Sequence, residues 1–338
     1  MSKKQGERYP IERSPFYRMG RAVDLARVLG LSPKKLRELI VKRRALYNFR
    51  TEEINGKTRS LAVPLDEMRD AHERIKELLN RIVPRDYLFS PRKGRSTFDN
   101  AKLHENSTNI EKVDVKQFYP STTDEHVFQF FYHRMKMAPD VAGRVTKLCT
   151  INSRVAFGSP VSPILCALVH DDIFAPVAEA VNAGGNAMSV WVDDVAISGR
   201  NVSPSLIRGL RRRVRAKRME AHRGQRAKVR GGVVITGTHV DSRGTSPANK
   251  THMKLRDKLE QLDGAASDAE RLTLVRSLIG LTTYCITVCN EGSAERQRHR
   301  SRLAWLHNLR RELERPPAVA TTAGATLTAV AGCSAPWE

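Results

Sequence analysis

The stretch MSVWVDDVAIS, residues 188–198, places two adjacent acidic residues in the middle of an alternating apolar pattern. Apolar side chains recur at every second position on both sides, which is typical of strands with one buried face. The sequence therefore predicts a strand, a tight turn at Asp193 and Asp194, and a returning strand. Adjacent carboxylates are unfavourable unless a cation neutralises them. An ordinary polar turn is a common alternative for this dipeptide, so the pair alone does not decide the function.

A third carboxylate, Asp114, lies upstream in VDVKQFYPS, residues 113–121. A carboxylate inside an apolar strand is costly unless it is paired, hydrogen-bonded or bound to a metal. If the fold brings Asp114 beside Asp193 and Asp194, their oxygens form a site suited to two Mg²⁺ ions. Such a pair supports phosphoryl transfer, because one ion activates the attacking hydroxyl and the other stabilises the leaving pyrophosphate.

The rest of the sequence predicts an α+β fold with helical regions at both ends. Within residues 110–199, short apolar runs with strand character alternate with helical patterns. Asn55-Gly56 favours a two-residue hairpin turn. Helices are expected to begin at Ser32-Pro33 and Ser203-Pro204, where a capping serine precedes a first-turn proline, and to fill residues 250–314. Further strands are expected at residues 49–54, 60–63 and 229–236.

The charge balance indicates a polyanionic partner. The chain has 58 Lys and Arg against 36 Asp and Glu, a net charge of +22 and a pI of about 10.2. Such an excess destabilises a compact state by self-repulsion, which a bound polyanion relieves. Nucleic acid is the first candidate for this partner and an anionic membrane surface is the second.

Targeting signals and cysteine chemistry favour a cytoplasmic protein with no membrane partner. No stretch has the length and hydropathy of a transmembrane helix, and the basic N-terminus lacks the apolar segment of a signal peptide. The five cysteines form no CxxC pair and no cluster with histidines. A reducing compartment is therefore expected.

Five segments together resemble the conserved motifs of reverse transcriptases. VDVKQFYPS resembles motif A, GSPVSPIL (residues 158–165) resembles motif B, and WVDD (residues 191–194) resembles motif C. GKTRSLAVP (residues 56–64) and SPRKGRST (residues 90–97) resemble two motifs of the fingers. The motifs occur in the family's order, and they cover most of residues 45–200.

The resemblance implies a right-hand polymerase fold and a division of the chain. Residues 1–109 would form the fingers with an N-terminal helical extension, and residues 110–241 the palm with the catalytic site. Residues 242–314 would form a helical, RNA-binding thumb, and residues 315–338 a flexible tail.

The resemblance also implies roles for individual residues at the metal site. Asp114, Asp193 and Asp194 correspond to the catalytic carboxylates, and the backbone carbonyl of Val115 to a further metal ligand. Two Mg²⁺ ions are the implied cofactor.

Contacts with the incoming dNTP are implied for Arg59, Tyr119, Phe157 and Gly158. Arg59 falls where the family contacts the triphosphate, and Tyr119 where an aromatic ring excludes a ribose 2′-hydroxyl. Phe157 stands where the family often has Gln, and Trp191 where it usually has Tyr. Both departures keep bulk and lose a polar contact.

Three more segments resemble the retron branch of bacterial reverse transcriptases: NAKLH at residues 100–104, ITG at residues 235–237, and GLTTYCITVCN at residues 280–290. This resemblance implies a noncoding RNA that serves as template and primer, a DNA product joined to an RNA 2′-hydroxyl (msDNA), an effector protein, and a role in antiphage defence. For Asn100 and His104, RNA recognition competes with a helix cap and a packed polar side chain.

Contacts with this RNA are expected along basic surfaces, where arginines on one helix face suit phosphates. The candidate residues are Lys93, Arg95, Asn100, His104, Arg211, Arg212, Arg215 and Arg218. A solvated helix face is the alternative for the arginines.

Two other functions compete with the retron interpretation. A defence-associated reverse transcriptase outside the retrons would use a different template or none, and Phe157 and Trp191 favour it. A catalytically inactive RNA-binding protein is disfavoured, because it has no reason to hold three carboxylates together.

Overall fold

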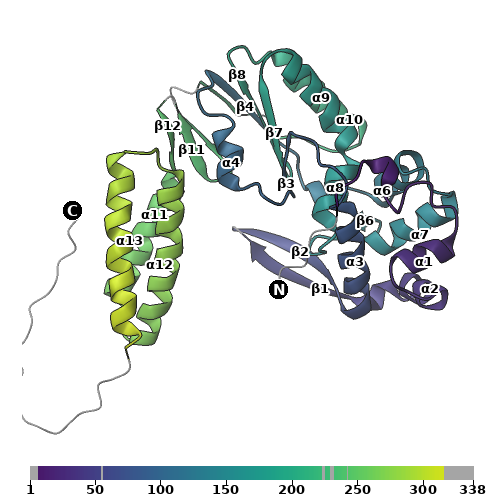
Figure 1. The fold of residues 1–338 in the computed structure, drawn as a ribbon, viewed down its shortest axis with the longest axis horizontal. Coiled ribbons are helices and arrows are strands. Elements are labelled where there is room, and N and C mark those ends of the chain that lie inside the picture. The colour runs from purple at the N-terminus through teal and green to yellow at the C-terminus, as the bar shows by residue number, and fades with distance from the viewer. Residues whose placement is uncertain (1–6, 55, 223–224, 229–231, 242, 316–338) are drawn as a thin grey trace, which may run out of the picture. The chain divides into compact units, whose positions relative to one another are not determined.

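The computed structural model describes residues 7–54, 56–222, 225–228, 232–241 and 243–315. The expected tail lies outside the described residues from position 316 onward. The chain forms two compact units, one with residues up to 252 together with 287–293, the other with residues 253–286 and the chain from 294 (Figure 1). The second unit thus holds most of the residues expected to form a helical C-terminal region.

The first unit begins with short helices and a hairpin. Ser32 caps its helix as predicted, since its Oγ accepts a hydrogen bond from the Lys35 amide at 3.1 Å. The hairpin pairs Tyr47 with Pro64 at one end and Ile54 with Lys57 at the other, which confirms a two-residue connection. The elements are η1 (Ile11–Arg13), α1 (Ala22–Val28), α2 (Pro33–Val41), η2 (Arg43–Leu46), β1 (Tyr47–Ile54), β2 (Lys57–Pro64) and α3 (Asp66–Leu79).

A five-stranded sheet forms the centre of this unit, in the order β3-β7-β8-β4-β9. Its pairs are antiparallel except β3 with β7. The α+β class is therefore as predicted. The strands are β3 (Leu88–Ser90), β4 (Asn109–Asp114), β7 (Ala187–Trp191), β8 (Asp194–Gly199) and β9 (Gln225–Lys228).

The two faces of the sheet carry different cores. Val113, Val195 and Ile197 belong to the larger core, together with residues of α9 (Asp171–Ala183) and α10 (Pro204–Ala216), which lie along the sheet in Figure 1. Ile110 and Ala196 face the other way, into a smaller core with α4 (Thr97–Lys102), β10 (Val233–Ile235) and β11 (Thr238–Asp241). Because side chains alternate along a strand, Asp114 and Asp194 share the face of this smaller core.

Further elements complete the first unit. They are α5 (Phe118–Ser121), α6 (Asp124–Gln129), the π-helix η3 (Phe130–Arg134), α7 (Pro139–Cys149), β5 (Thr150–Ile151), β6 (Arg154–Val155), α8 (Ser162–Val169) and β12 (Gly244–Pro247). The strand expected over residues 229–236 is present as β10, whereas residues 229–231 lie outside the described residues.

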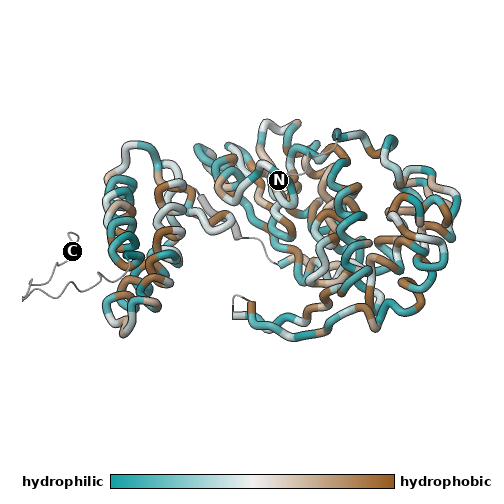
Figure 2. The backbone as a smooth tube through the Cα atoms, turned by 60° about the horizontal axis from the view of Figure 1, so that its bottom comes forward, coloured by the Kyte–Doolittle hydropathy of each residue, from teal (hydrophilic) through white to brown (hydrophobic). Residues whose placement is uncertain are grey.

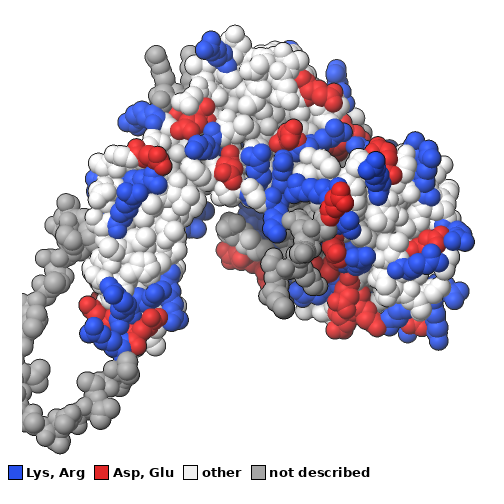
Figure 3. Space-filling view, viewed as in Figure 1, with Lys and Arg blue, Asp and Glu red and all other residues white. Residues whose placement is uncertain are grey.

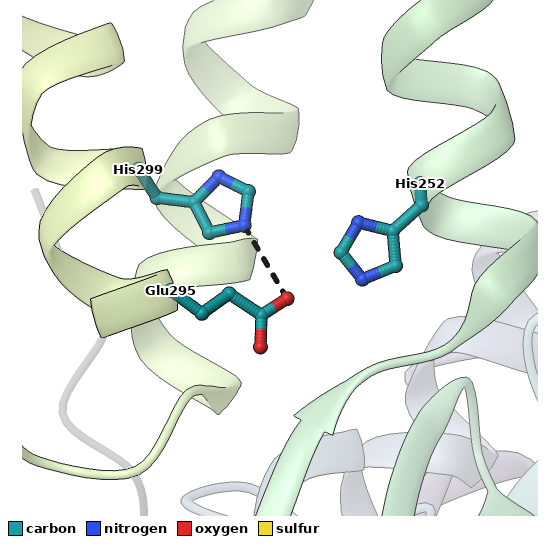
Figure 4. Close-up of side chains that lie close together, drawn as sticks. All are labelled: His252, Glu295 and His299. Atoms are coloured by element: carbon teal, nitrogen blue, oxygen red, sulfur yellow. Dashed lines mark ion pairs between the residues drawn. The ribbon is translucent and has the colours of Figure 1, made fainter. Parts of the chain in front are cut away.

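The second unit is built from three long helices around a small apolar core of Leu255, Leu262, Val275, Leu278 and Leu306. On α13, Glu295 Oε1 lies 3.9 Å from His299 Nε2, one turn further along the helix (Figure 4). The helices are α11 (Asn249–Asp263), α12 (Asp268–Val288) and α13 (Ala294–Leu313), which confirms the predicted helical region.

Polar residues interrupt the apolar ones along all three helices (Figure 2). Among the described residues, no helix combines the length and apolar character needed to cross a membrane.

Candidate active site

Strand pairing brings the three candidate carboxylates to one end of the sheet. Asp114, the last residue of β4, pairs with Asp194, the first residue of β8. The amide of Val115 donates a hydrogen bond to the Asp193 carbonyl at 3.0 Å, so the chain after β4 stays beside the hairpin. The structure therefore juxtaposes residues that are far apart in the sequence, as predicted.

The hairpin turn consists of Val192 and Asp193, because Trp191 still pairs with Asp194. The prediction of a turn at Asp193 and Asp194 was displaced by one residue. Val192 has a φ of 59°, a left-handed conformation that a β-branched residue rarely adopts. Such strain costs on the order of 1–3 kcal/mol and concentrates at functional sites.

The carboxylates are held together without enough cationic partners. Burial raises the pKa of Asp193 to about 6, and the neighbouring charge of Asp114 adds to the shift. Burial also raises the pKa of Asp194, although Lys112 Nζ, 3.8 Å from its Oδ2, opposes this shift. A raised carboxylate pKa means that the charged form lacks compensation, which a bound cation would supply. An oxygen-only donor set of this kind fits Mg²⁺.

Two basic side chains near the carboxylates were not among the site residues expected from the sequence. Lys112 Nζ donates to the Val234 carbonyl at 3.0 Å besides approaching Asp194. His222 Nε2 lies 3.5 Å from Asp114 Oδ2, and its amide donates to the Asp114 carbonyl at 2.8 Å. Lys112 lies two residues before Asp114 on β4 and therefore shares its face of the sheet. Strand periodicity could thus have placed Lys112 beside the carboxylates.

A cavity of about 320 Å³ is lined by three of the four expected nucleotide contacts, Tyr119, Phe157 and Gly158. The rings of Tyr119 and Phe157 have centroids 5.6 Å apart. The Arg59 guanidinium lies over the Phe157 ring, 5.3 Å from its centroid, which is a cation–π distance. Arg59 also lowers the pKa of Asp193, although burial outweighs it. The fourth contact is thus near both the cavity and the carboxylates.

Glycine is required at position 158, where the β1–β2 hairpin meets this cavity. Its φ is +112°, and a Cβ there would stand 3.1 Å from Val63 Cγ2. The adjacent Phe157 carbonyl accepts a hydrogen bond from the Ala62 amide at 2.8 Å. The loop of motif B and strand β2 are therefore fixed against each other.

The basic turn before α4 borders a second groove, of about 730 Å³, which Lys93 and Arg92 help to line. Arg95 stacks 4.8 Å from the Phe89 centroid. Burial and the charges of Arg95 and Arg8 lower the pKa of Arg92. Crowded arginines favour an anionic ligand, and Figure 3 shows Lys and Arg side chains gathered over the middle of this unit.

The arginines of α10, together with Arg218 just after its end, form a separate basic surface. Arg212, Arg215 and Arg218 are exposed, whereas Arg211 is half-buried. The apolar side of the helix is buried through Ile207, Leu210 and Val214. The helix contains no acidic residue, so the charged side chains on its exposed side are all basic.

Asn100 and His104 do not lie on a surface that RNA could reach. His104 is fully buried, and its two ring nitrogens are each 2.7 Å from a serine hydroxyl, of Ser198 and Ser189. Asn100 is 2% exposed and donates to Thr236 Oγ1 at 3.3 Å. Both are packed polar side chains, and this corrects the expectation of direct RNA contact. Two of the three segments that carry the retron resemblance, residues 100–104 and 235–237, thus contact each other.

Comparisons with known proteins agree with these motifs. The model of the family described as reverse transcriptase (RNA-dependent DNA polymerase) matches residues 42–221. The chain is 27% identical over 177 residues to a retron Se72 reverse transcriptase of Salmonella heidelberg, covering 52% of this chain and 47% of that protein. It is 23% identical over 183 residues to a retron Ec86 reverse transcriptase of Escherichia coli, covering 53% and 57%.

The match with these curated relatives spans about half of their length. A solved structure of a foamy viral protease-reverse transcriptase in complex with double-stranded DNA aligns with 80% of this chain and 46% of that chain. Its TM-score is 0.42 at 13% identity.

Proposed function

The chain belongs to the reverse transcriptase family, and from this premise we propose that it is an RNA-directed DNA polymerase that copies part of a noncoding RNA into DNA. The observation that carries the proposal is the register that pairs Asp114 with Asp194 beside Asp193. A hairpin turn alone would not gather three poorly compensated carboxylates at one sheet end.

The residues around the cavity suggest how nucleotide and metal are held. Asp114, Asp193 and Asp194, with the Val115 carbonyl, would hold two Mg²⁺ ions, which supply activation of the primer hydroxyl and stabilisation of the leaving pyrophosphate. Arg59 would bind the triphosphate, since it lies close enough to Asp193 to influence its pKa. The Tyr119 ring would stand against a ribose 2′-hydroxyl and select dNTPs.

The remaining assignments extend the same proposal. Within the first unit, the fingers and palm would meet near residue 109, and the second unit would act as an RNA-binding thumb. The exposed arginines of α10 and the basic turn at Lys93 and Arg95 would contact RNA phosphates.

A retron activity is the finer form of the proposal. Both curated relatives are named as retron reverse transcriptases, and two retron-like segments pack together through Asn100 and Thr236. The RNA would act as template and primer, with DNA growing from one of its 2′-hydroxyls, and an effector protein would complete an antiphage system. A defence-associated reverse transcriptase that uses another template, or none, is the alternative that Phe157 and Trp191 favour.

The test is extraction of nucleic acid from the purified protein. A short DNA covalently joined to RNA is expected from the wild type and not from the Asp193→Ala, Asp194→Ala double variant. Asp86→Ala, which removes a fully exposed carboxylate, is the matched control. DNA without attached RNA would support the non-retron alternative, and bound RNA without DNA from any variant would contradict polymerase function.

A further inference from the structure

Two buried histidines each bind serine hydroxyls of a different part of the candidate active site. We propose that His72 positions the nucleotide cavity and His104 positions the acidic hairpin, so that each controls a different kinetic constant. This inference rests on the proposed polymerase function. His72 lies outside every motif that the sequence indicated, and His104 was expected to contact RNA rather than to support the carboxylates.

His72 reaches the motif B loop from α3. It is fully buried; its Nδ1 lies 2.6 Å from Ser159 Oγ and its Nε2 lies 2.7 Å from the Leu148 carbonyl. A carbonyl can only accept, so Nε2 carries the proton and Nδ1 accepts from the Ser159 hydroxyl. Burial lowers the pKa of His72 to about 4, which keeps the ring neutral and able to accept.

Ser159 transmits this contact to the nucleotide cavity. It directly follows Phe157 and Gly158, and all three line the same cavity. Its Oγ also accepts from the Val161 amide at 3.3 Å, which ties the start of α8 to the loop. Without the acceptor at His72, the hydroxyl loses its buried partner and the cavity wall loses its support from α3.

His104 makes the equivalent contacts at the hairpin. Ser189 lies on β7 and Ser198 on β8, the two strands that flank Asp193, and both hydroxyls are 2.7 Å from the imidazole. All three side chains are fully buried. Burial lowers the pKa of His104 to about 4. A neutral ring that links both strands restricts their movement, and with it the carboxylates at their end.

The two histidines therefore act on different groups. His72 supports residues that would contact the nucleotide in the ground state and the transition state alike. Loss of such uniform binding raises KM with little change in kcat. His104 supports the two strands that carry Asp193 and Asp194 at their ends, and misplacement of these carboxylates lowers kcat.

The experiment is steady-state incorporation of one dNTP on a primed RNA template, with the dNTP concentration varied. His72→Gln offers an amide nitrogen toward Leu148 and removes the acceptor for Ser159, whereas His72→Asn offers an oxygen near the position of Nδ1. His72→Gln and Ser159→Ala are each expected to raise KM for the dNTP about five- to tenfold, with kcat within about twofold. Their combination should add little, because both remove the same hydrogen bond.

His72→Asn should recover part of the KM loss. His104→Gln is expected to lower kcat about tenfold and to leave KM within about twofold of wild type. Leu36→Ala creates a void in the core at a residue that does not line the nucleotide cavity, and so controls for general destabilisation. All variants are compared below their unfolding temperatures.

The inference is overturned if His72→Gln and His104→Gln change KM and kcat in the same pattern, or if both behave like Leu36→Ala. An inactive wild type would instead contradict the proposed polymerase function, whatever the variants do.

Discussion

The two units of the protein differ in where they keep their polar groups. The first unit buries polar side chains deep inside: Asp171, for example, accepts from Tyr87 and pairs with Arg134 Nη2 at 2.7 Å. The core of the second unit is a cluster of leucines and one valine, and most of its arginines lie at or near the surface. His299, buried beside Glu295, is a polar exception there (Figure 4).

This difference determines how far each unit's function can be inferred from single residues. Buried polar groups need partners, so their positions are fixed and their substitution has specific consequences. Surface charge binds any polyanion of suitable shape, and individual residues contribute little. Single substitutions in the first unit are therefore expected to abolish or alter specific steps. Substitutions in the second unit are expected to weaken nucleic-acid binding by small increments.

The largest effect is expected at the acidic hairpin. Asp193→Asn should reduce polymerase activity by at least about a thousandfold, because the proposed metal site would lose one of its ligands. The same change should raise the unfolding temperature without Mg²⁺ by a few degrees. Burial and Asp114 raise the pKa of Asp193 to about 6, so its charge at pH 7.5 destabilises the folded state, and the amide removes that charge.

The measurement is thermal unfolding with and without Mg²⁺, beside primer extension. Mg²⁺ should stabilise the wild type and have little effect on Asp193→Asn. Asp86→Asn, at a fully exposed position, should change neither stability nor activity. A variant less stable than the wild type in the absence of Mg²⁺ would show that the carboxylate is stabilising as it stands.

In the first unit, the sequence predicted the strand arrangement better than the buried polar contacts. Motif order and period-two alternation were sufficient to predict the hairpin and the place of Asp114, because strand pairing leaves few arrangements. For His104 the sequence left RNA contact and a packed polar side chain as alternatives. It did not decide between them, since the partners Ser189 and Ser198 lie in strands whose small polar residues carry no periodic signal. The displaced turn at Val192 was missed because its positive φ contradicts the local preference of valine.

An intermediate effect is expected from acid. Burial lowers the pKa of His72 and of His104 to about 4, and that of His170 to about 3, where nearby His126 and Lys217 add to the effect of burial. The unfolded chain takes up these protons near pH 6.5, whereas the folded protein does not. The free energy of unfolding should therefore fall as the pH drops from about 6.5 to 4, by about 1.4 kcal/mol per pH unit for each histidine.

Hydrogen exchange read by mass spectrometry at pH 7, 6 and 5 separates the two units, after correction for the intrinsic pH dependence of exchange. Protection of the sheet should decrease toward pH 5, and His72→Gln should reduce the slope by the share of one histidine. Glu73 favours the charged form of His72 and so partly opposes the lowering of its pKa by burial. A sheet whose protection is constant with pH would contradict neutral burial of these rings.

The smallest effects are expected on the basic surfaces. Replacing Arg298, Arg300 and Arg311, the exposed arginines of α13, by Gln should weaken binding of single-stranded RNA and leave dNTP incorporation per bound RNA unchanged. The slope of log K against log salt should decrease by about 2, since each neutralised phosphate contributes about 0.7. The equivalent triple variant, at Arg212 and Arg215 of α10 and at Arg218 just after it, should give a similar decrease if both surfaces contact the same RNA.

Fluorescence anisotropy of a labelled RNA over a range of KCl concentrations measures both slopes. Arg27→Gln is the matched control, because this exposed arginine lies on α1 and pairs with Asp24 at 3.1 Å. A decrease in the salt slope for the α13 variant alone would assign RNA binding to the second unit. A decrease for the α10 variant alone would assign it to the first unit. Equal slopes for all three variants and the wild type would contradict both surfaces. The +22 net charge would then act only through long-range attraction, which no single substitution removes.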